Sequence, residues 1–180
     1  MLYHVGTQKI ETERLILRKF ETIDAKDAFK NWMGDPENVK YLGWRSHENF
    51  QQTLDTISKW TSLYNKKNYY KWAIVLKETE EVIGQINVIL ILEHVDCMEL
   101  GYVLSKKYWN NGIMTETLKA VQSYLFSKVN CHRIQARHDM LNLASGKVMI
   151  NVGMQFEGIL RQSGKNNSNE WIDAAIYSII

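Results

Sequence analysis

Apolar residues recur at intervals of three and four along several stretches of the chain, which is the spacing of one face of an α-helix. This spacing runs from Phe50 to Leu63 and predicts a helix over about residues 48–64. It also runs from Leu118 to Val129 and predicts a helix over about residues 113–127. Two more helices are expected, one over about residues 22–33 and one over residues 143–152, before Gly153.

Shorter stretches are apolar at alternate positions or throughout, and these predict strands. The strands cover residues 14–20, 69–77, 82–92, 98–104, 131–138, 154–161 and 171–179. Polar turns are expected at residues 34–37, 77–81, 94–96 and 163–169. Because three strands follow one another in the middle of the chain without helices between them, the sheet should be mostly antiparallel. The whole pattern predicts an α+β domain with about seven strands in one sheet and about four helices packed on it.

Composition narrows the class of protein. The chain has 180 residues, of which 45% are hydrophobic and 23% charged, and these values are typical of one globular domain. A formal net charge of +2 is too small to indicate nucleic-acid binding. No apolar stretch approaches the roughly 18 residues of a membrane span, and residues 1–9 lack the features of a signal peptide. Cys97 and Cys131 have no metal-like spacing, a disulfide is not expected, and the cytoplasm is the expected location.

The first candidate for chemistry is the turn before the helix predicted from residue 113. Asn and Gly residues with positive φ can direct backbone N–H groups towards one point, and a helix N-terminus adds its own unbonded N–H groups. A phosphate or pyrophosphate site is therefore predicted at Asn110, Asn111, Gly112, Ile113, Met114 and Thr115. The plainer interpretation is that Asn110 or Asn111 caps the helix. Glu116 would oppose a bound phosphate unless it points away.

Glu99 is the candidate general base. It lies in the strand before the turn, and alternation places it on one face with Gly101 and Val103. Burial among apolar neighbours would raise the pKa of its carboxyl towards that of a useful base. The alternative is an exposed carboxylate on a solvent-facing strand, and alternation alone favours this alternative.

A third candidate lies at the start of the helix predicted from residue 143. Asn142 is expected to cap this helix, and Ser145, about one turn later, could direct its hydroxyl towards the helix start at Gly112. Serine is common on helix surfaces, so this position alone indicates little. His132 and His138 share a strand face but lie roughly 20 Å apart at about 3.3 Å per residue. His4, His47 and His94 have no acidic or cysteine companions at ligand spacing, and no metal site is predicted.

Seven short motifs occur in a fixed order along the chain. They are residues 14–18 (RLILR), 82–84 (VIG), 99–105 (ELGYVLS), 108–116 (YWNNGIMTE), 132–137 (HRIQAR), 142–145 (NLAS) and 156–161 (FEGILR). Together they resemble the GNAT N-acetyltransferases, specifically the branch that includes the ribosomal-protein alanine and serine N-acetyltransferases. The resemblance covers about residues 12–178, which are expected to form the acetyltransferase domain, with residues 1–11 as an N-terminal extension.

The resemblance implies acetyl-CoA as co-substrate, with its pyrophosphate on the turn at residues 110–115. The pantetheine arm would lie along the strand that ends at Val103 and Leu104, as an additional strand would. The fourth and fifth predicted strands are then expected to splay apart and form a V-shaped slot for this arm. Further candidates for binding the co-substrate are Asn142, Lys106, Lys107 and Lys147.

The implied reaction is direct attack of a primary amine on the thioester carbonyl. Glu99 would take the proton of the amine, directly or through a water, and a backbone N–H near Val103 would stabilise the oxyanion. Many relatives place a tyrosine seven residues after the asparagine equivalent to Asn142, as acid for the leaving thiolate. This chain has Met149 there, so Ser145 becomes the candidate acid.

Several alternatives stay open. The acceptor could be a protein N-terminus, such as that of a ribosomal protein, or a small amine such as a polyamine, an amino acid or an antibiotic. The turn departs from the family pattern, with Trp109 where Arg or Gln is usual and Met114 where a small residue is usual. With the missing tyrosine, these departures leave open a non-catalytic module that binds acetyl-CoA. A domain that binds no ligand is the plainest alternative, and a homodimer is neither indicated nor excluded.

Overall fold

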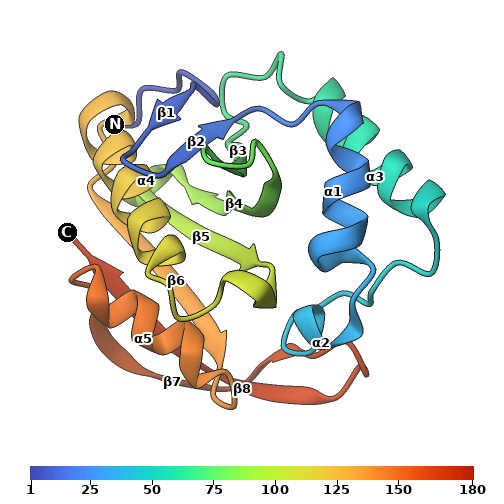
Figure 1. Cartoon of the computed structure of the whole chain (residues 1–180). Coiled ribbons are helices and arrows are strands. Elements are labelled where there is room, and N and C mark those ends of the chain that lie inside the picture. The colour runs from blue at the N-terminus through green and yellow to red at the C-terminus, as the bar shows by residue number, and fades with distance from the viewer.

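Eight strands form one twisted sheet in the computed structural model, which describes all 180 residues (Figure 1). The strands are β1 (Ile10–Glu11), β2 (Leu15–Arg18), β3 (Lys71–Leu76), β4 (Val82–Leu92), β5 (Cys97–Leu104), β6 (Arg133–Asp139), β7 (Gln155–Lys165) and β8 (Trp171–Ile179). Their order is β1-β2-β3-β4-β5-β6-β8-β7, and only β5 and β6 are parallel neighbours. The predicted α+β class and mostly antiparallel sheet are confirmed, with eight strands in place of about seven.

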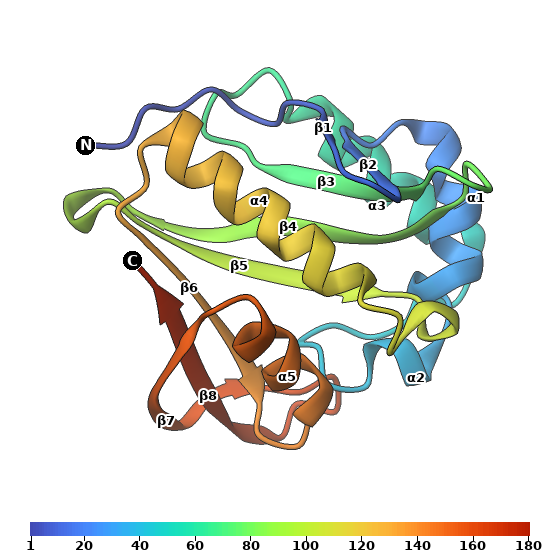
Figure 2. The same ribbon diagram turned by 60° about the vertical axis from the view of Figure 1, so that its left-hand side comes forward.

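The additional strand is β1, which pairs with β2. With two residues it is too short to show an alternating pattern. The segment before it packs against α4 (Ile113–Val129), the helix that it follows in Figure 2. The Tyr3 N–H donates to the Val129 carbonyl at 2.7 Å, and the Tyr124 hydroxyl donates to the Gly6 carbonyl at 2.6 Å. These contacts join the start of the chain to the central helix.

Helices cover both faces of the sheet. α4 and α5 (Leu143–Asn151) lie on one face, and α1 (Ala25–Ala28), α2 (Pro36–Val39) and α3 (Phe50–Ser62) lie on the side of the other (Figures 1 and 2). α1 continues as a π-helical turn over Phe29–Met33. None of the helices has both the length and the apolar character needed to cross a membrane.

The turn predicted at residues 34–37 is wrong, because α2 begins inside it. The Asp35 side chain accepts a hydrogen bond from the Glu37 N–H at 3.0 Å, and Pro36 occupies the first helical position. The Asp-Pro pair is common both in tight turns and at helix starts. Since α2 is a single helical turn, it is too short to show the apolar spacing that would distinguish a helix from a turn.

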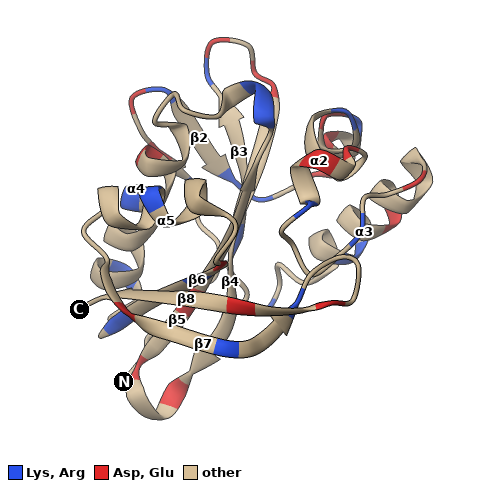
Figure 3. Ribbon diagram, turned by 90° about the horizontal axis from the view of Figure 1, so that it is seen from below, with Lys and Arg blue, Asp and Glu red and all other residues tan.

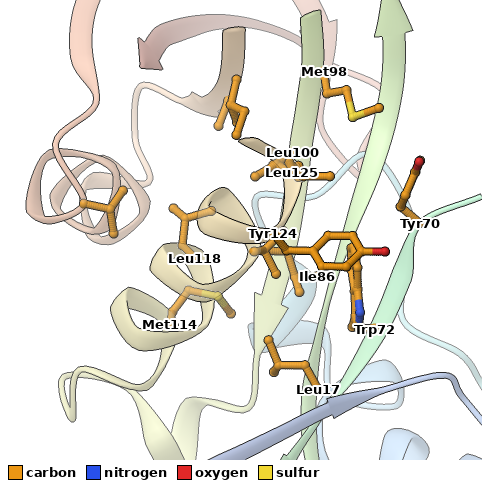
Figure 4. Packing of buried hydrophobic residues seen from close by; sticks show 14 of the residues in the cluster. Leu17, Tyr70, Trp72, Ile86, Met98, Leu100, Met114, Leu118, Tyr124 and Leu125 are labelled. Atoms are coloured by element: carbon orange, nitrogen blue, oxygen red, sulfur yellow. The ribbon is translucent and has the colours of Figure 1, made fainter. Parts of the chain in front are cut away.

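Two hydrophobic clusters hold the helices to the sheet. The larger includes Leu118 of α4 together with Trp72 and Leu100 of the sheet (Figure 4). The smaller lies on the opposite face and includes Trp32 and Val103. Burying a side chain of this size stabilises the fold by about 1.5–3 kcal/mol. Since Leu100 and Val103 belong to different clusters, packing on both faces determines which way each β5 side chain points.

β5 and β6 pair over only part of their lengths. Their parallel register runs from Cys97 opposite Arg133 to Leu100 opposite Ala136. Both strands continue beyond this last pair without facing partners, so they diverge and leave an open fork. The splaying expected for the fourth and fifth predicted strands is confirmed, since these are β5 and β6.

Candidate active site

The turn before α4 leaves the first turn of that helix without a cap. Gly112 is the N-cap residue, with φ of 72°, and no side chain bonds to the first-turn N–H groups. Asn110 is also left-handed, with φ of 62°. The Asn111 amide donates to the Trp109 carbonyl at 3.2 Å and not to the helix. The interpretation of Asn110 or Asn111 as a helix cap is therefore wrong, and the N–H groups stay available to an anion.

Glu116 does not oppose an anion at this turn, because its carboxylate is bound on the other side. It accepts hydrogen bonds from the Thr12 hydroxyl at 2.5 Å and from the Arg14 Nε at 2.7 Å. Burial raises the pKa of Glu116, but the hydrogen bonds from Thr12 and Arg14 outweigh burial and hold that pKa below its usual value. Arg14 also donates to the Asn111 carbonyl at 2.9 Å and so holds the turn in place. The Glu116 carboxylate therefore pairs with Arg14 and does not face the N–H groups of the turn.

A cleft of about 430 Å³ begins at this turn and runs along the fork. Most of the residues predicted to bind the co-substrate line it: Val103, Leu104, Asn110, Gly112, Ile113, Met114, Thr115, Asn142 and Lys147. Ser145 also lines the cleft, whereas Asn111 does not. The fold thus brings together the end of β5, the start of α4 and the start of α5, which are far apart in the sequence.

The peptide groups at the end of β5 alternate between its two neighbours. The Val103 carbonyl faces β4, since a Cβ on Gly84 would lie 2.5 Å from it. The peptide groups of Tyr102 and Leu104 therefore face the fork. The Leu104 carbonyl accepts hydrogen bonds from the Trp109 indole at 2.8 Å and from the Asn38 amide at 3.1 Å. An N–H group directed into the fork near Val103 thus belongs to Tyr102 or Leu104. Trp109 holds the end of β5 through its hydrogen bond to Leu104.

The start of α5 places a pair of hydroxyl groups in the cleft. The Asn142 side chain accepts from the Ser145 N–H at 3.3 Å, as expected of a helix cap. The Ser145 hydroxyl donates to the Tyr102 hydroxyl at 2.9 Å, and Tyr102 donates to the Ser145 carbonyl at 3.2 Å. Burial raises the pKa of Tyr102, so this phenol stays protonated. Tyr102 was not among the predicted site residues, because alternation groups it with the core residues Leu100 and Leu104.

Glu99 is buried, with 3% of its residue surface exposed, so the interpretation as a solvent-facing carboxylate is wrong. The expected apolar surroundings are wrong too. Its Oε2 accepts a hydrogen bond from the Gln135 amide at 2.8 Å, and its Oε1 lies 2.7 Å from the Arg137 Nε. The N–H of Arg137 is not aligned with Oε1, which accepts no hydrogen bond although it is in charge contact. Glu99 lies three residues before Tyr102, outside the lining of the cleft.

Of the lysines considered for phosphate binding, only Lys147 lines the cleft. Lys106 pairs with Asp35 at 2.8 Å, and Lys107 lies 3.1 Å from the Tyr108 hydroxyl. Lys119 was missed. It borders a polar pocket that shares Gly112 and Thr115 with the cleft, and its place in the middle of α4 gave no sequence signal. Nowhere do three His, Cys, Asp or Glu side chains gather in a way that could hold a metal ion.

The opposite mouth of the cleft is bridged. Glu37, Tyr41 and Leu42 line this side, and they lie in or just after α2. The tip of the β7–β8 hairpin meets the same segment, as Figure 1 shows at the lower right. The Arg45 Nε donates to the Asn167 carbonyl at 3.0 Å, and the Asn167 amide donates to the Val39 carbonyl at 3.3 Å. The bridge thus joins the hairpin tip to the segment that lines this side of the cleft.

Comparison with known proteins agrees with this arrangement. Residues 14–155 match the sequence profile of the acetyltransferase (GNAT) domain. A protein named uncharacterized N-acetyltransferase YoaA, from Bacillus subtilis (strain 168), is 33% identical over 171 residues, which are 95% of this chain and 96% of that protein. The ribosomal protein uS5-alanine N-acetyltransferase of Escherichia coli (strain K12) is 23% identical over 168 residues, which are 86% of this chain and 82% of that enzyme.

A solved structure shows the same fold. The crystal structure of a GNAT-family acetyltransferase from Bacillus anthracis superposes with a TM-score of 0.84 at 27% identity and covers 96% of this chain and 98% of its own. The family profile, the relatives and the superposition all agree with the motif resemblance. The chain belongs to the GNAT acetyltransferase family.

Proposed function

We propose that this protein transfers an acetyl group from acetyl-CoA to a primary amine. The observation that carries the proposal is the meeting of the β5–β6 fork with the uncapped start of α4 in one cleft. The fork leaves an edge of β5 free for an extended ligand, and a helix N-terminus with unbonded N–H groups attracts a diphosphate. In an acetyltransferase family, acetyl-CoA is the ligand that has both an extended arm and a diphosphate.

The residues around the cleft fit this co-substrate. The N–H groups of residues 112–115 would bind the pyrophosphate, and Gly112 adopts the left-handed φ that the turn requires. Lys147 in the cleft and Lys119 in the adjoining pocket would add positive charge for the phosphates. The N–H groups of Tyr102 and Leu104 would bind the pantetheine arm or the developing oxyanion. When bound, acetyl-CoA supplies an acetyl group activated as a thioester.

Glu99 would act as the general base. A primary amine is mostly protonated at neutral pH and must lose a proton before its nitrogen attacks the acetyl carbon. The Oε1 of Glu99 accepts no hydrogen bond from the protein but has almost no accessible surface, so the Arg137 side chain beside it would have to move before it receives an N–H or a water. Because Glu99 is not among the residues that line the cleft, transfer through water fits its position better than direct contact.

Ser145 would supply the proton that the leaving thiolate takes as the C–S bond breaks. Its hydroxyl already lies within a hydrogen bond of the Tyr102 hydroxyl, at 2.9 Å. As Ser145 gives up its proton, the protonated Tyr102 phenol would turn its O–H from the Ser145 carbonyl to the Ser145 oxygen, pass its proton there, and regain one from solvent. Met149 occupies the position where many relatives carry a tyrosine, so this pair would take over the role of that residue.

We propose a protein N-terminus as the acceptor, such as that of a ribosomal protein. One relative of this chain is a ribosomal protein uS5-alanine N-acetyltransferase, and a flexible N-terminus is slender enough to pass the bridge between Asn167 and the α2 segment. The same bridge admits a small amine, which makes acetylation of small amines the second candidate. With either acceptor, we expect the protein to act in the cytoplasm.

The test is release of CoA by the purified protein with acetyl-CoA and a panel of amines. The panel contains peptides with free N-termini, the same peptides blocked at the N-terminus, and small amines. Release with free but not blocked peptides supports the proposed acceptor, and release only with small amines supports the second candidate. Tight binding of acetyl-CoA without turnover on any acceptor would contradict catalysis and favour a sensor, and failure to bind it would contradict the whole proposal.

A further inference from the structure

The fork carries a cationic group that the proposed acid–base steps do not use, the guanidinium of Arg137. Arg137 is the first β6 residue after the last β5–β6 pair, which joins Leu100 and Ala136. Alternation places its side chain on the face of Gln135, and Gln135 binds Glu99. The guanidinium therefore lies where the two strands separate, beside the proposed base.

Most of the donors of this guanidinium are unused. The Nε lies 2.7 Å from Oε1 of Glu99, and neither terminal nitrogen donates a hydrogen bond to the protein. The Arg137 side chain is 39% exposed, whereas that of Glu99 is 3% exposed. A guanidinium presents its terminal N–H groups in a planar fork that matches two oxygens of a carboxylate. The exposed side of Arg137 is thus able to bind an anion from solution.

Arg133 on the same strand and face provides a direct contrast. Both of its terminal nitrogens bind the carboxylate of Glu157, and Nη1 also donates to the Ser178 hydroxyl at 2.8 Å. Its charge and its donors are satisfied inside the protein. The open donors of Arg137 are therefore a feature of the fork and not of arginines on this strand in general.

Near the fork, Arg137 has Glu99 as its only carboxylate partner. Glu99 is balanced by Arg137 itself, and the neighbouring polar residue of β4, Asn87, is neutral. Lys71 lies opposite Asn87 on β3, but it is buried and its pKa is lowered to about 7, so it adds little positive charge at the fork. Elsewhere Lys and Arg are interspersed with Asp and Glu over the helices and loops (Figure 3). An anionic group at the fork would therefore meet the unused donors of Arg137 without a second carboxylate that competes for them.

We propose that Arg137 selects acceptors that carry an anionic group, such as a carboxylate, close to the reactive amine. Glu99 takes the N–H side of such an acceptor, directly or through a water, and the terminal nitrogens of Arg137 bind its carboxylate. The selection rests on the acetyl transfer proposed above. The carboxylate can belong to a small amino acid or to an acidic residue next to the N-terminus of a peptide, and both present the same chemistry.

The experiment compares acceptors in matched pairs with acetyl-CoA present. One pair is γ-aminobutyrate and butylamine, and the other is a peptide that starts Ala-Asp and the same peptide that starts Ala-Asn. The wild type is expected to show a kcat/KM at least about 10-fold higher for the anionic member of a pair, the scale of one charge-assisted contact. Preference within only one of the pairs supports the selection and identifies the source of the carboxylate.

Substitution of the arginine tests its role. Arg137→Gln should bring the ratio within a pair close to one, and Arg137→Lys should retain part of the preference. Arg161→Gln is the matched control, because Arg161 is exposed on β7 outside the proposed machinery, and it should leave the ratio unchanged. Both members of a pair are measured on one preparation, so a reduced folded fraction cancels from the ratio.

The outcomes separate this selection from the proposed function. Turnover of both members at equal kcat/KM, or a preference that survives Arg137→Gln, refutes the selection and leaves acetyl transfer intact. No CoA release with any acceptor refutes both. If Arg137→Gln does not fold, the wild type still decides: its preference should fall several-fold between about 0.05 M and 0.5 M salt, and a salt-independent preference refutes the role of charge.

Discussion

Glu99 shows how much of the chemistry of a side chain depends on its partners. The residue is a buried carboxylate with Gln135 on one oxygen and Arg137 near the other. Its second oxygen accepts no hydrogen bond, which is rare for a buried carboxylate, and it lies 2.7 Å from the Arg137 Nε. A carboxylate with one free acceptor beside a cleft fits a proton acceptor.

Glu99→Gln is expected to lower kcat by about 10²-fold or more, because an amide cannot take a proton from the amine. The measurement is steady-state CoA release, with circular dichroism to check folding. Glu157→Gln is a matched control, since Glu157 is also paired with an arginine on this sheet. Unchanged turnover in Glu99→Gln would remove this residue from the mechanism.

Lys71 is a buried cation without a counter-ion. The residue is 6% exposed, and its ammonium lies 3.8 Å from the centre of the Trp60 ring. Burial lowers the pKa of Lys71 to about 7. The unfolded chain therefore binds a proton between about pH 7 and 10.5 that the folded protein does not, so this group makes stability rise with pH across that window.

Lys71→Met should raise the free energy of unfolding at pH 7 and below, and the gain should shrink as the pH approaches 10. The wild type loses up to about 1.4 kcal/mol for each pH unit through this group as the pH falls across the window, and the variant does not. Urea unfolding at a series of pH values measures the difference. Lys128→Met, at an exposed position of α4, serves as control; a pH-independent difference would contradict the assignment.

At the level of the elements, the start of α4 combines the positive end of a helix dipole with Gly112, whose left-handed backbone conformation favours glycine. Gly112→Val is expected to weaken acetyl-CoA binding by about 10-fold or more, because a β-branched residue is strained at φ of 72° and disturbs the N–H groups. Isothermal titration measures the affinity. Gly153→Val is equally strained, with φ of 85°, but lies at the end of α5. Equal affinity losses in the two variants would refute the anion site.

The β4–β5 pair depends on another glycine for its close approach. A Cβ at Gly84 would lie 2.5 Å from the Val103 carbonyl and 3.1 Å from the Leu104 Cα, both of which are backbone atoms. Gly84→Ala should therefore force the strands apart and destabilise the protein by about 1–3 kcal/mol. Gly164→Ala is the control, since a Cβ there would only touch Ile172 at 3.5 Å. Similar unfolding midpoints for both variants would contradict the steric argument.

Across the whole molecule, the cleft joins elements from the first and last thirds of the chain. The β7–β8 hairpin crosses to the α2 segment through Asn167, whose contacts with Arg45 and Val39 are at the surface. Hydrogen bonds in such places contribute about 0.5–1.5 kcal/mol each. These two hydrogen bonds are therefore strong enough to order the hairpin tip and weak enough to break without unfolding the domain.

Replacing both bridging side chains, as Arg45→Ala with Asn167→Ala, should speed amide hydrogen exchange in residues 163–169 several-fold, because two hydrogen bonds are lost. The unfolding midpoint should change little, because the core is untouched. Exchange followed by mass spectrometry measures this, with Ser168→Ala as control. Unchanged exchange at the hairpin tip would show that the bridge does not order it.

The quality of prediction from sequence varied with the range of the interactions. The α3 and α4 helices follow their own apolar periods, and α5 follows its cap and stop signals, so all three were located within a few residues. β1 and α2 were missed, since two residues and one helical turn carry no period. The contacts of Glu99 with Arg137 and of Ser145 with Tyr102 were also missed, because their partners lie tens of residues away and no local pattern relates them.

The sequence by itself determined the helix and strand periods, the turn with Gly112 before α4, and the order of motifs that identifies the acetyltransferase family. These depend on local backbone preferences and on residue types that can be read one segment at a time. Only the tertiary structure decided that β5 and β6 part after Leu100, that Glu99 is buried against Arg137, and that the hairpin reaches α2. Such features arise from long-range packing, in which each segment gains its partner only when the whole chain has folded.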